Sequence, residues 1–523
     1  MFSYLKLQGT TMTISPSAKN ALTLAAVCLA SLMFGLEISS IPVILPTLET
    51  VLLSDFKELQ WIMNAYTLAC TAILMAIGTL ADRYGRKRLF VVSLMLFSVT
   101  TLVCGLATNT SVLIAGRFLQ GMAGGAMLIC QIAVLSNQFT ESGARGKAFG
   151  SWGIVFGLGL GFGPIIGAAI VAISSWEWVF LVHVPIAIIA LALVFMGVEE
   201  SRDPQKRSLD VKGIIFLSLS VFGLVWYITQ APTLGFISPV AITLLGATLL
   251  CLVIFIMAER SNSAPMFDFS VFRIRRFSGA LLGSVGMNFS FWPFMIYIPL
   301  YFQNVLGYSN VAAGLSLLAY TLPTLVFPPV GEKLSLRYRA EVVIPAGLFT
   351  IGAGFLLMKW GSSLESASWL TMLPGCLLAG IGLGITNTPV TNTTTGSVAN
   401  ECAGMASGID ISARMISLAI NIALMGFILV EGISDYLRST LSGATDFTQL
   451  RQLAEGLSAG NITMMEQITP VMNISSTTVQ GALSQGFGWV MIYGSVSVWI
   501  LAICSFLIFK ENGVKIPGSG DWK

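Results

Sequence analysis

Charged residues are scarce in this chain of 523 residues. Asp, Glu, Lys and Arg make up 10% of it, whereas hydrophobic residues make up 55%. A soluble domain carries about a quarter charged residues, so the composition excludes an ordinary soluble protein. The single histidine and the eight scattered cysteines offer no metal-ligand cluster and no disulfide framework. We expect neither an enzyme nor a metal or cofactor, because no nucleophile–base set and no nucleotide-binding loop can be assembled. A nucleic-acid partner is not expected either.

Long apolar runs recur from one end of the chain to the other. About 20 apolar residues suffice to cross a bilayer. Fourteen spans are predicted, at 21–46, 60–80, 89–107, 111–136, 149–172, 179–198, 213–232, 239–258, 278–300, 311–330, 342–360, 370–393, 405–429 and 486–509. The polar segment 430–485 is expected to be an irregular or partly helical external loop. The chain is therefore predicted to be an all-α polytopic membrane protein.

Positive charge sets the expected orientation. Lys and Arg concentrate in alternate connections between the predicted spans, for example at 83–88 and 333–339. Cytoplasmic loops of membrane proteins carry such an excess, so both termini are predicted to be cytoplasmic. The first apolar run has no small-residue cleavage site and reads as a true span.

A weak internal repeat predicts the domain organisation. Gly78–Leu89 (GTLADRYGRKRL) follows the second predicted span, and Gly331–Arg339 (GEKLSLRYR) follows the tenth. If spans seven and eight are an insertion, these are equivalent loops of two six-helix halves, at 1–198 and 277–523, with two helices in 199–276. Alternating-access transporters are built from such repeats.

Glu37 is the most informative single residue. It lies within the apolar run Ala21–Pro46, and a carboxylate near the bilayer midplane costs about 3 kcal/mol even on mild scales. Low dielectric favours the neutral acid over the carboxylate. Glu37 is therefore predicted to take up and release a proton.

Several motifs resemble those of one family. GTLADRYGRKRL resembles the signature between helices 2 and 3 of the major facilitator superfamily. The stretches LEISSIPVILP, WIMNAYTL and WEWVFLVHVP, which start at Leu36, Trp61 and Trp176, resemble motifs of its fourteen-span drug:proton antiporter branch. That branch usually has Asp where this chain has Glu37. The resemblance implies the major facilitator fold with 6 + 2 + 6 helices.

The resemblance also implies roles for the loop residues. Gly78 and Gly85 would allow close helix approach and a tight turn, Arg83 and Arg86 would supply positive charge, and Asp82 would cap a helix N-terminus, where negative charge is favoured.

Arg117 matches the family's fourth-helix arginine. A guanidinium inside a span must face a cavity or a carboxylate, and Glu37 is the natural partner. The resemblance implies that this pair couples transport to protons. The alternative is a permanent ion pair that only fixes helix packing.

The fifth predicted span is rich in glycine. Gly159, Gly163 and Gly167 share one helix face, a pattern for tight packing in membranes. With Pro164 this run resembles the superfamily's antiporter motif, which implies export and a kinked helix at the interface between the halves.

The remaining candidates are weaker. Asp410 and Arg414 are one turn apart, so they form either a locally satisfied pair or a substrate or gating site. His183 stands where the family usually has Asn, and we favour a packing or hydrogen-bonding role over proton relay. Further candidates for substrate contact are Asn64, Tyr66, Trp292 and Tyr297.

The sequence as a whole predicts a proton-coupled antiporter in a bacterial inner membrane, working as a monomer. It would export amphipathic organic compounds such as drugs, dyes or antiseptics by alternating access. One alternative is a dedicated exporter of a single natural metabolite or siderophore. The other is a membrane sensor or scaffold that no longer transports.

Overall fold

Helices make up nearly all of the structure, a computed structural model that describes residues 15–54, 56–202, 210–235, 237–262, 269–364, 366–398, 403–441, 447–459 and 475–510. The N-terminal helices are α1 (Pro16–Leu52), α2 (Phe56–Tyr84), α3 (Arg86–Gly105), α4 (Thr110–Gln138), α5 (Ser142–Ile173), α6 (Glu177–Leu181) and α7 (His183–Gly197). They are followed by α8 (Val211–Leu234), α9 (Pro239–Ser261) and the 3-10 helix η1 (Phe269–Arg273). The C-terminal helices are α10 (Arg275–Asn304), α11 (Asn310–Thr321), α12 (Pro323–Val326), α13 (Pro328–Tyr338), α14 (Ala340–Ser362), α15 (Trp369–Gly396), α16 (Ala403–Thr440), α17 (Phe447–Ala459) and α19 (Ser476–Lys510).

All fourteen predicted spans fall on these helices. Within the described residues, 12 helices are long and apolar enough to cross a membrane, and the bent pair of 44° formed by Val311–Val326 and Pro328–Tyr338 brings the number to 13. The second predicted span lies in α2, a helix of 29 residues. The apolar stretch found in α2, Trp61–Leu74, is shorter than a membrane span, so α2 is not among the 12 helices. A multi-pass helical membrane protein is thus confirmed, and the count of fourteen stays a prediction.

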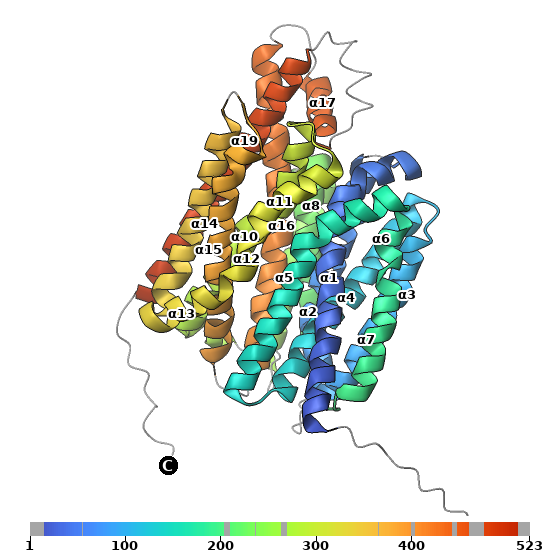
Figure 1. Ribbon diagram of the computed structural model, residues 1–523, viewed down its shortest axis with the longest axis vertical. Coiled ribbons are helices and arrows are strands. Elements are labelled where there is room, and N and C mark those ends of the chain that lie inside the picture. The colour runs from blue at the N-terminus through green and yellow to red at the C-terminus, as the bar shows by residue number, and fades with distance from the viewer. Residues whose placement is uncertain are drawn as a thin grey trace, which may run out of the picture.

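The helices form two groups that repeat the same neighbour pattern. In the first, α1 packs against α5 and α7, and α4 packs against α2 and α3. In the second, α10 packs against α16 and α19, and α15 packs against α13 and α14. Each group has its own buried apolar core, and Figure 1 shows the two groups side by side. This pattern is the structural counterpart of the weak repeat in the sequence.

Two further helices lie between the groups in the chain order. α8 packs against α9, and it also contacts α2 of the first group and α16 of the second. Leu68 of α2 and Val225 of α8 are buried against each other. The outward side chains of α9 are apolar and exposed, including Leu249, Leu250 and Val253, as expected for a helix facing lipid.

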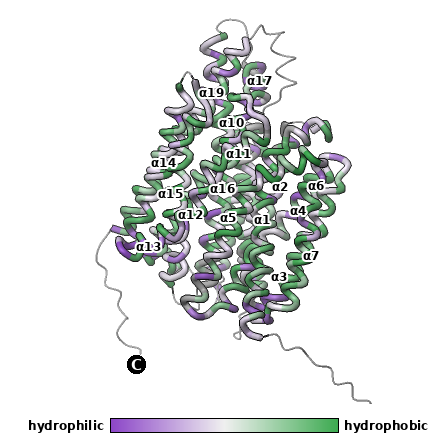
Figure 2. The backbone as a smooth tube through the Cα atoms, in the orientation of Figure 1, coloured by the Kyte–Doolittle hydropathy of each residue, from purple (hydrophilic) through white to green (hydrophobic). Residues whose placement is uncertain are grey.

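Hydrophilic residues gather at the ends of the molecule. Figure 2 shows hydrophobic residues along the helices and hydrophilic ones around α13 and the lower ends of α1 and α3. At that lower end, Lys19 near the start of α1 pairs with Glu199 after α7 at 2.6 Å. The hydrogen bond from Lys19 lowers the pKa of the Glu199 carboxyl. In the other group, Ser505 near the end of α19 donates to the Gly279 carbonyl near the start of α10 at 2.8 Å.

The segment 430–485 is more helical than the sequence analysis expects. The helix predicted to end at 429 continues to Thr440, and the last one begins at Ser476 rather than at 486. The reason is apolar burial: Ile433 and Leu437 of α16 pack with Leu453 and Leu457 of α17 and with Val479 of α19. Residues 442–446 and 460–474 of this segment lie outside the described residues.

Candidate functional site

Glu37 and Arg117 form a buried ion pair between α1 and α4. A guanidinium nitrogen of Arg117, Nη1, lies 2.5 Å from Glu37 Oε1. The exposed fractions of the two residues are 0% and 2%. The pairing that the sequence analysis expects is therefore present in the structure.

Glycines on α4 let this helix approach α2 closely enough to hold Arg117. A Cβ on Gly121 would overlap the Tyr66 backbone, and one on Gly125 would lie 2.8 Å from the Cys70 carbonyl oxygen. Close approach of this kind is the usual role of small residues between membrane helices. The run AGRFLQGMAGGA therefore places the arginine against the second helix as well as the first.

The guanidinium of Arg117 has further partners besides Glu37. Its Nε donates to the Ile62 carbonyl at 3.1 Å, and Nη1 also donates to Gln120 Oε1 at 2.8 Å. Its Cζ lies 4.3 Å from the centre of the Tyr66 ring, a distance at which a cation is attracted to the ring face. Gln120 is in turn held by Thr101, whose Oγ1 accepts from Nε2 at 2.8 Å. The sequence analysis did not identify Gln120, although it follows Arg117 by one helical turn.

The second carboxylate oxygen of Glu37 faces a histidine. His183 Nδ1 lies 3.5 Å from Glu37 Oε2 and 3.1 Å from the Phe180 carbonyl oxygen. His183 is 1% exposed, and its ring packs edge-on against Phe97. The sequence analysis favours packing or hydrogen bonding for His183, and the structure adds that the ring lies beside the carboxylate. The carboxylate therefore lies between a guanidinium and an imidazole, away from solvent.

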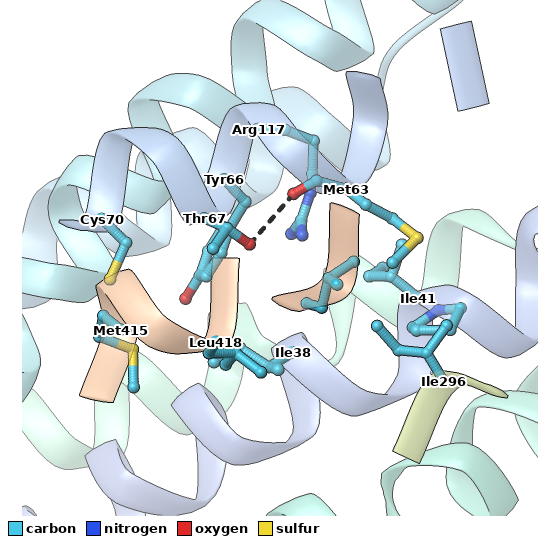
Figure 3. Close-up of a pocket in the computed structure, with 12 residues that line it drawn as sticks. Ile38, Ile41, Met63, Tyr66, Thr67, Cys70, Arg117, Ile296, Met415 and Leu418 are labelled. Carbon is cyan, nitrogen blue, oxygen red and sulfur yellow. Dashed lines mark hydrogen bonds between the residues drawn. The ribbon is translucent and has the colours of Figure 1, made fainter. Parts of the chain in front are cut away.

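A small cavity of about 50 Å³ lies beside the pair, between the two groups of helices. One wall comes from the first group: Ile38, Ile41, Pro42, Met63, Tyr66, Thr67, Cys70 and Arg117. The other comes from α10 and α16: Ile296, Met415, Leu418 and Ile422. Figure 3 shows Tyr66 and Arg117 on one side, with Met415, Leu418 and Ile296 around the same space. Sites for drug-sized ligands measure about 300–1,000 Å³, so such a ligand fits only when the halves move apart.

The glycine face of α5 packs against α1. A Cβ on Gly159 would lie 2.8 Å from the Leu32 carbonyl oxygen, and one on Gly167 would lie 2.9 Å from Ser40 Cβ. Pro164 lies inside α5, which runs on to Ile173 without a break. The opposite face of α5 meets the second group of helices, where a Cβ on Gly161 would lie 3.2 Å from Thr321. The helix is thus packed tightly on both sides, and one side is the interface between the groups.

Asp410, which is buried, and Arg414, which is partly buried, form a second ion pair, on α16. Arg414 Nη2 lies 2.9 Å from Asp410 Oδ2. The same guanidinium donates to Asn387 and Thr391 of α15, each at 3.0 Å. The pair ties two helices of the second group together and does not line the cavity.

Three other candidates lie away from the cavity wall. Tyr297 is buried in the second core, and its hydroxyl donates to the Ile422 carbonyl at 2.6 Å. Trp292 packs against the same core, and Asn64 is not among the lining residues. In this conformation α10 contributes Ile296 to the cavity instead.

The α2–α3 loop is held by a residue that the sequence analysis did not identify. Gly85 has a φ of +114°, a conformation that glycine adopts without strain. The carboxylate of Glu200 accepts from the backbone nitrogens of Lys87 and Arg88 at 3.2 and 3.3 Å. Glu200 therefore supplies the negative charge at the start of α3. A Cβ on Gly85 would lie 2.7 Å from its carboxyl carbon.

The remaining loop candidates are less constrained. Asp82, predicted to cap a helix, belongs to α2, but its side chain lies outside the described residues. Arg86 donates to Asn137 at 3.3 Å, and Arg83 lies 5.7 Å from the Tyr84 ring. A Cβ on Gly78 would meet only Ile129 at 3.9 Å, so close helix approach does not require glycine there.

The comparison with known families agrees with this architecture. The Major Facilitator Superfamily matches residues 27–421, more than half of the chain. The chain belongs to the Major Facilitator Superfamily. That membership makes it a multi-pass membrane transporter, and its relatives are transporters rather than enzymes.

Characterised relatives are similar over most of their length. The multidrug resistance protein Stp of Mycobacterium tuberculosis is 31% identical over 435 residues, which are 83% of this chain and 80% of that protein. The tetracenomycin C resistance and export protein of Streptomyces glaucescens is 30% identical over 422 residues, covering 79% and 76%. Among solved structures, the human organic anion transporter MFSD10 has the same fold. Its TM-score is 0.61 at 13% identity, and the match covers 95% of this chain and 100% of that one.

Proposed function

We propose that this protein is a proton-coupled antiporter that exports amphipathic organic compounds across a bacterial inner membrane. The observation that carries the proposal is the buried Glu37–Arg117 pair beside a cavity between the two halves. Relatives named for multidrug resistance and for antibiotic export support the substrate class. We further propose fourteen spans with cytoplasmic termini, in two bundles at 1–198 and 277–523 with 199–276 between them. Because one chain carries both bundles, it would work as a monomer.

The cavity wall suits varied apolar substrates. Methionine side chains are flexible and polarisable, and Met63 and Met415 approach the space from opposite halves. Tyr66 adds an aromatic face. Such a wall adapts to ligands of different shape and does not require hydrogen bonds of fixed direction from them.

Coupling follows from the charges of the pair. While Glu37 is ionised, it neutralises Arg117 at the cavity wall. A proton on Glu37 leaves the positive charge of Arg117 uncompensated beside the cavity, which disfavours a cationic substrate there. Proton and substrate then tend to exclude each other, as antiport requires. Opening and closing of the halves would carry them in opposite directions.

The test is export from proteoliposomes under an imposed pH gradient, with ethidium as the probe. Glu37→Gln keeps the size of the side chain and mimics the protonated acid. We expect this variant to fold, to bind ethidium and to exchange it down a concentration gradient, but to lose uphill, uncoupler-sensitive export. Full gradient-driven export by Glu37→Gln would show that coupling lies elsewhere, with Asp410 as the next candidate.

A further inference from the structure

We propose that His183 is a second proton-holding group of the Glu37 site, so that the transported proton is shared between Glu37 and His183. This inference rests on the proposed proton antiport. It adds a residue that the superfamily resemblance does not supply, because the family usually has Asn at this position.

The position of Nδ1 fixes where the hydrogen of the neutral ring lies. Nδ1 faces two oxygen acceptors, the Phe180 carbonyl at 3.1 Å and Glu37 Oε2 at 3.5 Å. A lone pair on Nδ1 would be repelled by both oxygens when Glu37 is ionised. Nδ1 therefore carries the hydrogen, and Nε2 carries the lone pair.

The other ring nitrogen is an open position for a proton. His183 Nε2 is buried and has no hydrogen-bond partner among the described residues. Glu37 Oε2 likewise accepts no hydrogen bond within the described part of the chain. A buried polar atom without a partner is energetically unfavourable. Oε2 faces Nδ1 at 3.5 Å, so a hydrogen held between these two atoms would give the carboxylate oxygen its missing partner. Within the described residues, Nε2 is free of any hydrogen bond that would oppose a second ring hydrogen.

One added proton can be held in two ways. It can bind Nε2, which gives an imidazolium whose Nδ1–H faces the Glu37 carboxylate. Alternatively, the hydrogen can lie on Oε2 and be donated to Nδ1, while Nε2 carries the ring hydrogen. The two forms contain the same atoms and differ by the transfer of one hydrogen between Nδ1 and Oε2. The proton then belongs to the couple rather than to either residue.

The charged groups around Glu37 explain why a second proton-holding group helps the site to take up a proton. Among the described residues, the titratable and charged groups that interact with Glu37 besides His183 are Arg117 from α4, Tyr66 from α2 and Cys104 from α3. Glu37 is the anion among them, and Oε1 is held by Arg117 at 2.5 Å. A proton on His183 adds the same unit of positive charge to the site as a proton on Glu37 would, and it does so without breaking that contact. With Asn at this position, the proton would have to bind Glu37 directly beside a bound guanidinium.

The first test observes the ring itself. His183 is the only histidine in the sequence, so the protein prepared without a histidine tag and labelled with 15N-histidine gives one imidazole. We expect hydrogen on Nδ1 at alkaline pH and a second hydrogen on the couple as the pH falls through the range that drives export. An imidazole spectrum that does not change over that range would overturn the inference.

The second test separates the histidine from the carboxylate. In proteoliposomes, His183→Asn should shift the outside pH for half-maximal ethidium export by about one unit towards acid, a tenfold change in proton concentration. Ser93→Ala, which removes a buried polar group of α3 bonded only to its own helix, should keep the wild-type profile. Superimposable profiles for His183→Asn and wild type would overturn the inference. If export by the wild-type protein does not depend on the pH gradient, the proposed function is overturned instead. In that case the imidazole spectrum still tests whether His183 binds a proton.

Discussion

Gly163 of α5 and Ser39 of α1 lie so close together that a Cβ on Gly163 would overlap the Ser39 hydroxyl. That hydroxyl donates to the Gly35 carbonyl of its own helix at 2.9 Å and to the Gly159 carbonyl of α5 at 3.1 Å. The two helices are thus joined by a hydrogen bond at their point of closest contact. Ser39 lies only two residues beyond Glu37 on α1, so this contact fixes the helix that carries the carboxylate against α5.

Gly163→Ala should therefore reduce both stability and export. Alanine is favoured over glycine inside a helix by about 1 kcal/mol, so any loss must come from overlap, which typically costs about 1–3 kcal/mol. We expect a lower melting temperature in detergent and slower ethidium export. Gly153→Ala on the same helix is the matched control, because a Cβ there meets nothing within 4 Å. Adding Ser39→Gly should restore part of the lost stability, and equal losses in Gly153→Ala and Gly163→Ala would contradict the steric explanation.

Glu200 should stabilise the α2–α3 loop by capping α3. Its carboxylate accepts three backbone hydrogen bonds, from Lys87, Arg88 and Ser201 at 3.2, 3.3 and 3.0 Å. Loss of a capping side chain costs about 0.5–2 kcal/mol, so we expect Glu200→Ala to unfold at lower temperature, with Glu200→Gln in between. Glu199→Gln is the control, because Glu199 makes an exposed ion pair with Lys19, and such pairs contribute little to stability. A larger loss in Glu199→Gln than in Glu200→Ala would argue against the cap.

Much of the fold could be predicted because it depends on composition along the chain. Apolar runs of sufficient length located a helix at each expected span, and the pairing of Glu37 with Arg117 followed from two charges within one half. The glycine face of α5 followed from spacing alone. These features depend on one segment, or on the need to pair a buried charge.

The rest depends on contacts between distant segments. His183 and Glu37 are far apart in sequence, and their approach depends on how α7 is rotated against α1. Glu200 follows α7 and is far in sequence from the start of α3, where its carboxylate binds. Nothing in its local sequence indicates a cap. The cavity wall from α16 requires the relative position of the two halves. The extension of α16 to Thr440 was missed because Glu431, Asp435 and Arg438 lower the hydropathy of a segment whose apolar face packs on α17.

The ion pair on α16 should matter more for stability than for coupling. Asp410→Asn would leave the Arg414 charge with only the neutral partners Asn387 and Thr391, and breaking a buried ion pair typically costs about 3–5 kcal/mol. We expect a large fall in melting temperature, and partial recovery in the double variant Asp410→Asn with Arg414→Gln. If Asp410→Asn is stable but loses uphill export as Glu37→Gln does, the pair belongs to the coupling site instead.

The proposed topology predicts the outcome of reporter fusions. Fusions after Lys212 and after Arg276 should both read cytoplasmic, since each follows an even number of spans from a cytoplasmic N-terminus. A fusion at Gly443 should read external. The assay is the activity of paired reporters, one active only in the cytoplasm and one active only outside it. An external signal at Lys212 would mean that a span is missing or added before α8.

Arg117 should be required both for export and for a stable Glu37 carboxylate. Arg117→Ala removes the cation at 2.5 Å and the hydrogen bonds to Ile62 and Gln120, and it strands a fully buried carboxylate. Arg117→Lys keeps the charge, but one ammonium cannot reproduce the planar fork that meets these groups together. We therefore expect Arg117→Ala to lose export and stability, and Arg117→Lys to lose less of each. Arg451→Ala, which removes a partly exposed arginine paired with Glu431 and Glu455, should leave export close to wild type.

The double variant Arg117→Ala with Glu37→Gln separates the two roles of the pair. If the instability of Arg117→Ala comes from the stranded carboxylate, neutralising Glu37 should recover most of the melting temperature, because the uncompensated charge is gone. Uphill export should stay absent, because His183 alone lacks the carboxylate and the guanidinium whose charges are proposed to link proton and substrate. Unchanged instability in the double variant would show that the arginine acts mainly through Ile62, Gln120 and the Tyr66 ring. Gradient-driven export by either Arg117→Ala variant would show that the pair only packs the helices.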